Sequence, residues 1–323
     1  MGVYLGVDVG GTGAKVAVVD DKCCILAEAV RPTGAELAAE AIGDGIAVAM
    51  DEALAKLGLG RGDVAGVGVG CPGSIDDRAG VVVYANNLNM DNFHIRDYMY
   101  KKTGFSIALG NDANVAALGE VYAGCARGAE SAVIVTLGTG VGTGVVLNGS
   151  IMTGFTGAAA EMGHMVIAKD GVPCTCGRKG CWESYASATG LIRITGEAVA
   201  AYPESKLASL VQQNGKISGK TAFAAAKQGD AAGQAVVDEY IDYLAEGLAN
   251  IINIFFPEVI GLSGGISKEG ENLLAPLRSV VYSRVYGGDA DIKTRITQCT
   301  LGHQAGLVGA AMLGKQWMEA HSG

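Results

Sequence analysis

Apolar residues recur along the chain in two patterns, and each pattern predicts a different kind of element. Short runs rich in Val, Ile and Leu predict buried strands. These runs lie at 3–20, 64–70, 81–84, 106–110, 132–147 and 258–262. One apolar stripe at helical spacing predicts a long helix at 232–256, and further helices are expected at 35–57, which is Ala-rich, 113–124 and 303–319. Since strands alternate with helices in both halves, we expect an α/β fold with mixed sheets.

Two of these runs share one plan, which is a strand, a glycine turn and a second strand. They lie at 3–20 and 132–147, far apart in the sequence. Such self-similarity favours an internal duplication in which one copy opens each half of the molecule. No Pro- or Ser-rich linker separates the halves, so we expect a packed junction near residues 113–120.

Composition and charge narrow the class of protein. The chain has 323 residues, enough for about two domains that each bury a core, and 49% of them are hydrophobic. A net charge of −9 disfavours nucleic acid as a partner. No apolar run reaches the length of a membrane span, and the first residues lack the layout of a signal peptide. We therefore expect a cytoplasmic protein with no membrane partner.

Three glycine turns are candidates for binding a nucleotide. Glycine lets backbone N–H groups approach an anion closely, and a hydroxyl adds one more donor. The turns comprise Asp8, Gly10, Gly11 and Thr12; Gly138, Thr139 and Gly140; and Gly264 with Gly265. Asp8 could hold Mg²⁺ directly or through water. A plain hairpin turn is the alternative, but two related turns facing each other across a cleft can hold a nucleoside triphosphate.

A carboxylate follows the predicted strand at 106–110. Asn111 and Asp112 stand where that strand ends and a helix begins, and such strand ends carry reactive side chains in α/β proteins. Asp112 could take a proton from a substrate hydroxyl during phosphoryl transfer. The alternative is that Asp112 only caps the helix.

One short segment has the composition of a metal site. His164, Cys174, Cys176 and Cys181 lie within 18 residues and provide the Cys₃His ligand set of tetrahedral zinc. Four protein ligands leave no open position, so the site is expected to be structural. The metal would fix Glu161, His164 and Glu183 in one polar cluster suited to binding several hydroxyls. Free thiols and exposed acids are the alternatives.

Asparagines follow the predicted strand at 81–84. Three of the four residues at 86–89 are Asn, whose amides can donate to and accept from a polyol or make a turn. The residues alone leave both interpretations open.

Taken together, these motifs resemble the ROK family of sugar kinases, most closely its bacterial glucokinase-type members. The likeness extends over nearly the whole chain. It comprises DVGGT at 8–12, GCPGSID at 70–76, ANNLN at 85–89, GNDAN at 110–114, LGTGVGTGVV at 137–146, EMGH at 161–164, CTCGRKGCWESYAS at 174–187 and LSGGIS at 262–267. Two positions depart from the family pattern. Gly13 stands where Lys is usual, with Lys15 two residues later, and GAAA occupies 157–160.

The resemblance implies a two-domain actin-like (ribonuclease H-like, duplicated) fold with ATP and sugar in an interdomain cleft. The domains would be 1–117 and 118–305, with a C-terminal helix at about 306–323 packing back on the first. The resemblance implies that Asp112 is the general base. Sugar contacts fall on Asn87, Asn111, Glu161, His164 and Glu183, and phosphate contacts on Gly10, Gly11, Thr12 and Thr139, with Gly264 and Gly265 near the nucleoside.

The implied activity is ATP- and Mg²⁺-dependent phosphorylation of a hexose, with the 6-hydroxyl of glucose as the expected acceptor. N-acetylmannosamine, N-acetylglucosamine, fructose, mannose and allose remain open. A sugar-sensing repressor is a competing class, but such members begin with a helix-turn-helix, and here the first strand starts near Val3. An actin-like assembly protein without catalysis is the third class. A homodimer or homotetramer is expected.

Overall fold

The computed structural model describes residues 2–85, 88–288, 291 and 293–321. The chain forms two compact units. Unit 1 contains Met1–Ile134, Gly144–Ala160 and Cys299–Gly323, and unit 2 contains Val135–Thr143 and Glu161–Gln298. The division into domains at residue 117 expected above stays a prediction.

A five-stranded sheet forms the centre of unit 1. Its strand order is β3-β2-β1-β4-β7. The strands are β1 (Val3–Val9), β2 (Gly13–Asp20), β3 (Ile25–Pro32), β4 (Val64–Cys71) and β7 (Ile107–Asn111). β1, β2 and β3 pair antiparallel, whereas β1, β4 and β7 run parallel to one another. The sheet is therefore mixed, as the sequence predicted.

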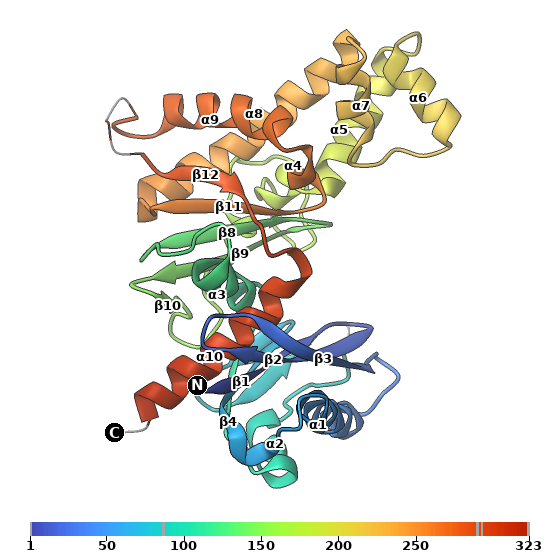
Figure 1. Cartoon of the computed structure of the whole chain (residues 1–323). Coiled ribbons are helices and arrows are strands. Elements are labelled where there is room, and N and C mark those ends of the chain that lie inside the picture. Colours follow the sequence, from blue (N-terminus) through green and yellow to red (C-terminus); the bar gives the residue numbers. More distant parts are fainter. Residues whose placement is uncertain (1, 86–87, 289–290, 292, 322–323) are drawn as a thin grey trace. The chain divides into compact units, whose positions relative to one another are not determined.

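Helices cover both faces of this sheet. α1 (Ala39–Ala55) packs on β2 and β3, and α10 (Ala305–His321) packs on the other face with α3 (Asp112–Ala123), as Figure 1 shows. Glycine lets α10 approach closely, because a Cβ at Gly6 would lie 2.0 Å from the Leu307 carbonyl oxygen. α2 (Ile95–Thr103) and the small hairpin of β5 (Ser74–Asp76) and β6 (Val81–Tyr84) complete this part.

A second sheet has the order β10-β9-β8-β11-β12. Its strands are β8 (Ala132–Leu137), β9 (Val141–Leu147), β10 (Ser150–Ile151), β11 (Val259–Gly264) and β12 (Arg295–Gln298). β10 pairs antiparallel with β9, whereas β11 and β12 pair parallel, so this sheet is mixed as well.

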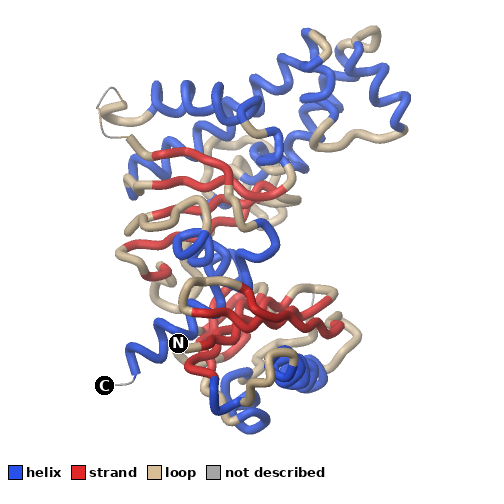
Figure 2. Tube along the Cα trace, viewed as in Figure 1, coloured by secondary structure: helices blue, strands red, loops and turns tan. Residues whose placement is uncertain are grey.

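Unit 2 is rich in helices, which are drawn in blue in Figure 2. They are α4 (Glu183–Ala186), α5 (Ala188–Ala201), α6 (Lys206–Asn214), α7 (Thr221–Lys227), α8 (Ala231–Phe255) and α9 (Glu271–Arg284). α8 is the long helix that its apolar stripe predicted, and α4, α5, α7 and α9 all contact it. Phe256 ends α8 with a φ of 41° just before Pro257. Among the described residues, no helix is long and apolar enough to span a membrane.

Several predicted elements agree with the structure, and others were absent from the prediction. The strand at 81–84 and the long helix are confirmed. The helix predicted at 35–57 is shorter, because Leu37 donates to the Gly34 carbonyl in a turn and Ala38 is still extended. The apolar pattern of the sequence did not predict α2, α5, α6, α7 or α9.

Candidate active site

The carboxyl ends of β1, β4 and β7 bring acidic groups together in unit 1. Asp8 pairs with Gly70 of β4, and Cys71 pairs with Asn111, the residue before Asp112. Burial raises the pKa of Asp8, and the negative charge of Asp112 raises it further. Burial and the charges of Asp112 and Asp8 raise the pKa of Cys71 to about 12. The three side chains therefore lie near one another at these strand ends, with Asp8 and Asp112 half-buried and Cys71 fully buried.

Asn111, rather than Asp112, is the N-cap of α3. The Asn111 side-chain oxygen accepts hydrogen bonds from the N–H groups of Ala113 and Asn114, at 2.9 and 3.3 Å. Its amide nitrogen donates to the Gly73 carbonyl at 3.0 Å. Asp112 is the first residue of the helix, where the helix dipole favours a carboxylate. The helix therefore has its own cap, and a cap role does not account for Asp112.

The pKa of Asp112 is raised from its ordinary value. Burial is the main cause, and a hydrogen bond from the Ala113 N–H opposes it. A raised carboxyl pKa brings the group closer to the pKa at which a general base works best near neutral pH.

The first glycine turn joins β1 to β2, and residues from outside the turn hold it. The Gly10 N–H donates to the Gly13 carbonyl at 2.9 Å. Thr33, which is buried, donates its hydroxyl to the Gly10 carbonyl and its N–H to the Thr12 carbonyl. Lys15 lies opposite Asp8 in the antiparallel pairing and lowers the pKa of that carboxyl. No sequence signal pointed to Thr33, because its role depends on the pairing of β2 with β3.

His164, Cys174, Cys176 and Cys181 form one cluster in unit 2, and their ligand atoms all lie within 4.8 Å of one another. The Cys174 sulfur lies 3.7 Å from His164 Nδ1, and the Cys176 and Cys181 sulfurs are 3.6 Å apart. Ligands of tetrahedral zinc are separated by about 3.5–3.8 Å, given Zn–S and Zn–N bonds of about 2.3 and 2.0 Å. The residues therefore fit zinc in number, type and spacing.

The electrostatics of the cluster also suit a metal. Burial disfavours ionisation of Cys174, but the Cys176 N–H, neighbouring thiols and His164 outweigh it and lower the Cys174 pKa to about 7. Burial and the neighbouring thiols raise the pKa of Cys181 to about 12. Because metals bind thiolates, the lowered pKa of Cys174 favours metal binding at this cluster.

Trp182 anchors the metal-binding loop to α8. Its side chain is fully buried, and its indole N–H donates to the Tyr243 carbonyl at 3.0 Å. A Cβ at Gly247 would lie 2.0 Å from the indole ring, so the ring packs against α8 at a position where a larger residue would clash. Cys181, one residue earlier, is therefore held by the core of unit 2.

The second glycine turn, Gly138–Gly140, lies beside this loop. Glu183 Oε2 accepts the Val141 N–H at 3.0 Å, and Oε1 of the same carboxylate lies 3.8 Å from the Cys174 sulfur. A Cβ at Gly264, which has a φ of 89°, would lie 2.3 Å from the Leu137 carbonyl. Unit 2 therefore brings together Glu183, the second glycine turn and the third.

Glu161 and His164 lie on the turn that follows residue 160. Met162–His164 form a 3₁₀ turn, and the His164 N–H donates to the Glu161 carbonyl at 3.0 Å. Glu161 precedes this turn and His164 ends it, so the two residues lie close together along the chain. Gly163 packs on the Val141 carbonyl, which places this turn beside the second glycine turn. Asn87, the remaining predicted sugar contact, lies outside the described residues.

The GAAA run carries local backbone strain. Ala160 has a φ of 70°, a left-handed conformation that costs a residue with a Cβ about 1–2 kcal/mol. We expect Ala160→Gly to raise the free energy of unfolding by about 0.5–1 kcal/mol after the greater entropy of unfolded glycine is subtracted. Urea unfolding of the two proteins measures this difference in the free energy of unfolding.

Ala158→Gly is the matched control, because Ala158 is exposed and is not among the residues with positive φ. That variant should lower the free energy of unfolding. Equal effects of the two substitutions would contradict strain at Ala160.

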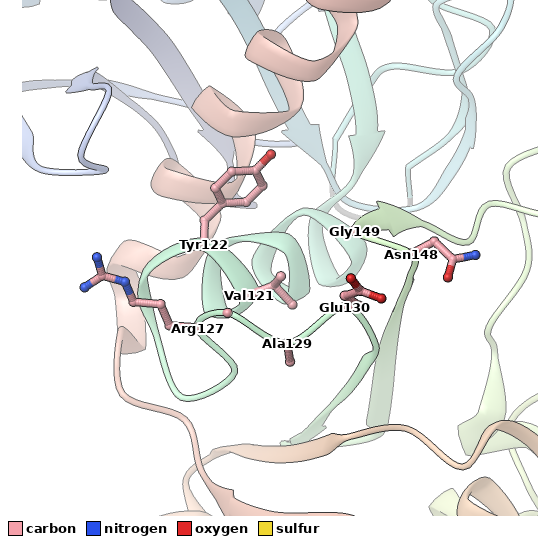
Figure 3. Close-up of a pocket in the computed structure, with 8 residues that line it drawn as sticks. Val121, Tyr122, Arg127, Ala129, Glu130, Asn148 and Gly149 are labelled. Atoms are coloured by element: carbon pink, nitrogen blue, oxygen red, sulfur yellow. The ribbon is translucent and has the colours of Figure 1, made fainter.

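Two cavities differ in their chemistry. One of about 500 Å³ in unit 2 includes Thr139, Gly140, Cys174, Glu183 and Thr189 among its lining residues. The other, of about 590 Å³, lies in unit 1 and is drawn in Figure 3. Its lining residues are Val121, Tyr122, Arg127, Gly128, Ala129, Glu130, Asn148 and Gly149. Predicted site residues therefore line the 500 Å³ cavity, whereas none lines the 590 Å³ cavity.

Comparisons with known proteins show the family of the chain. The ROK family model matches residues 4–317. The chain is 39% identical to a glucokinase of Halalkalibacterium halodurans over 315 residues, covering 97% of this chain and 95% of that protein. It is also similar to the structure of a ROK family glucokinase from Streptomyces griseus in complex with glucose and AMPPNP. That likeness has 35% identity, a TM-score of 0.76, and covers 98% of this chain and 100% of that chain.

A third likeness is to the ROK hexokinase of Thermus thermophilus, with 30% identity and a TM-score of 0.83. It covers 99% of this chain and 100% of that chain. The predicted α/β class with an actin-like fold is confirmed, and so is the resemblance drawn from the motifs. The chain belongs to the ROK family.

Proposed function

We propose that the protein is an ATP-dependent glucokinase in which Asp112 is the general base. Asp112 accepts the proton of the sugar 6-hydroxyl while that oxygen attacks the γ-phosphorus of ATP. The bond from the γ-phosphorus to its bridging oxygen breaks, and ADP leaves. Glucokinase relatives that span nearly the whole chain support the reaction and the acceptor.

The burial of Asp112 is the observation that carries the assignment of the base. The side chain stands where β7 ends, and burial raises its pKa while Asn111 already caps the helix. A half-buried carboxylate that no cap role explains is the group suited to take the substrate proton.

We propose that the turns at Gly10–Thr12 and Gly138–Gly140 bind the phosphates of ATP, with Gly264 and Gly265 near the nucleoside. Their backbone N–H groups offset the negative charge of the transferring phosphoryl group. Asp8 is the carboxylate we assign to Mg²⁺, directly or through water. Lys15, opposite Asp8, favours the ionised form of that carboxylate.

We assign sugar binding to Asn87, Asn111, Glu161, His164 and Glu183, as the family pattern implies. His164 is also the predicted zinc ligand, through the Nδ1 atom that faces Cys174. When bound, zinc would cross-link the loop. Its ligands would be His164, Cys174, Cys176 and Cys181. The cytoplasm and a homodimer or homotetramer remain predictions from the sequence.

A coupled assay of ADP release over a panel of sugars tests the function. The panel contains glucose, mannose, fructose, allose, N-acetylglucosamine and N-acetylmannosamine. We expect glucose to give the highest kcat/KM. The kcat/KM of each acetylated sugar should be at least about tenfold lower, because its added acetyl group needs space in a pocket shaped for glucose. A reaction without sugar is the control. ADP release that no sugar stimulates would favour a sugar sensor or an assembly protein instead.

A further inference from the structure

Three hydrogen bonds fasten the second glycine turn to the segment that follows the metal-binding loop. The Ala188 N–H donates to the Gly138 carbonyl, and the Thr189 hydroxyl donates to the Thr139 carbonyl, both at 2.8 Å. The Val141 N–H donates to Glu183 at 3.0 Å. Residues 183–189 therefore contact the turn at both of its ends and at its centre.

The same segment is fixed to the core of unit 2. Trp182 donates its indole N–H to the Tyr243 carbonyl, and the buried hydroxyl of Tyr240 donates to the Ala186 carbonyl at 2.7 Å. Ser187 caps α5 by accepting the Gly190 N–H at 3.1 Å. These bonds make residues 182–189 a rigid connection between Cys181 and the glycine turn.

Within α5, Thr189 contacts the turn through its side chain. The other bond from α5 uses a backbone N–H, which a substitution does not remove. Thr189 is exposed and belongs to the lining of the 500 Å³ cavity together with Thr139 and Gly140. Removing its hydroxyl would leave the Thr139 carbonyl without this donor and free the centre of the turn.

We propose that Thr189 is a positioning residue for the Gly138–Gly140 turn, and that the metal-binding loop holds the turn in its phosphate-binding shape through residues 183–189. The ligand class is the polyphosphate of a nucleotide. The role in nucleotide binding rests on the proposed function, whereas the ordering of the turn does not.

Thr189→Val keeps the shape of the side chain and removes its hydroxyl. We expect the KM for ATP to rise about fivefold, within the range of about 2- to 12-fold that one neutral hydrogen bond supports. The KM for glucose should stay within about twofold, and zinc content should not change. Thr189→Ser restores the donor and should restore the KM for ATP.

Amide hydrogen exchange of the nucleotide-free protein tests the ordering of the turn directly. Exchange at residues 138–141 should be faster in Thr189→Val and faster still after zinc is removed by chelation, because each loosens the connection. Thr195→Val is the matched control. Its hydroxyl donates to the Leu191 carbonyl within the same helix, at 2.7 Å, and does not contact the turn.

The outcomes separate this proposal from the proposed function. Unchanged exchange at 138–141 in Thr189→Val would overturn the positioning role. Faster exchange with an unchanged KM for ATP would overturn its link to the nucleotide. A wild-type protein that shows no sugar-dependent ADP release would overturn the glucokinase proposal, while the exchange result would still decide whether Thr189 orders the turn.

Discussion

Replacing Asp112 by Asn is expected to lower kcat by at least about 10², because a general base contributes about 10²–10⁴ in rate, or roughly 3–5 kcal/mol. The amide has nearly the shape of the carboxyl but cannot accept the proton of the sugar hydroxyl. Its side-chain oxygen can still accept the Ala113 N–H, so α3 should form as before. Steady-state ADP release with saturating glucose and ATP measures the loss.

Asp97→Asn is the matched control for this substitution. Asp97 is also in the first turn of a helix, α2, but it is exposed. Its amide variant should keep wild-type kcat. If Asp112→Asn retained near-normal turnover, Asp112 would have no role as the base.

The same variant should be more stable at neutral pH. Because the pKa of Asp112 is raised in the folded protein, the folded state binds more protons than the unfolded state between the ordinary and the raised value. Stability therefore falls as pH rises through that window, and the ionised carboxylate lowers the free energy of unfolding above it. We therefore expect Asp112→Asn to raise Tm at neutral pH, which thermal unfolding measures. The gain should disappear below the ordinary pKa of aspartate, where both side chains are neutral.

Removing the metal is expected to have the second large effect. Cys176→Ser, or chelation of the wild type, should reduce bound zinc from about one per chain toward none and lower Tm by several degrees or more, because structural zinc is coupled to folding. Cys176 is exposed, so the substitution leaves no cavity in the core. Elemental analysis and thermal unfolding measure the two effects.

Cys24→Ser provides the control, since Cys24 is also an exposed thiol but lies outside the cluster. Trp182 supplies an independent readout. It is fully buried one residue after Cys181, and Trp317 is the only other tryptophan in the sequence. In a Trp317→Phe background, chelation should shift the emission of Trp182 to longer wavelength. Freshly purified protein without zinc would contradict a structural metal.

Motifs with a fixed chemical requirement were readable from the sequence. The Cys₃His set is specified by residue type and spacing, and the structure brings all four ligand atoms within 4.8 Å. The strand at 81–84 and the helix that ends before Pro257 are local patterns, and both are confirmed. In each case the residue types within one short segment are enough to predict the element or the ligand set.

Roles that depend on distant parts of the chain were not readable. Whether Asn111 or Asp112 caps α3 is a matter of side-chain geometry, and the structure assigns the cap to Asn111. Glu120 is another example, because its buried carboxylate accepts the N–H groups of Cys125, Thr300 and Leu301. Its partners at 300 and 301 lie 180 and 181 residues away in the sequence.

The sequence by itself determined the family, the ligand set for zinc and the acidic residue at the end of β7. These follow from residue types at short spacing, whose chemistry does not depend on the rest of the fold. Only the tertiary structure decided that Asp8, Cys71 and Asp112 lie near one another and that Thr33 and Thr189 hold the two glycine turns. Sheet pairing and helix packing bring those groups together. The residues next to them in the sequence do not indicate which distant groups they will contact.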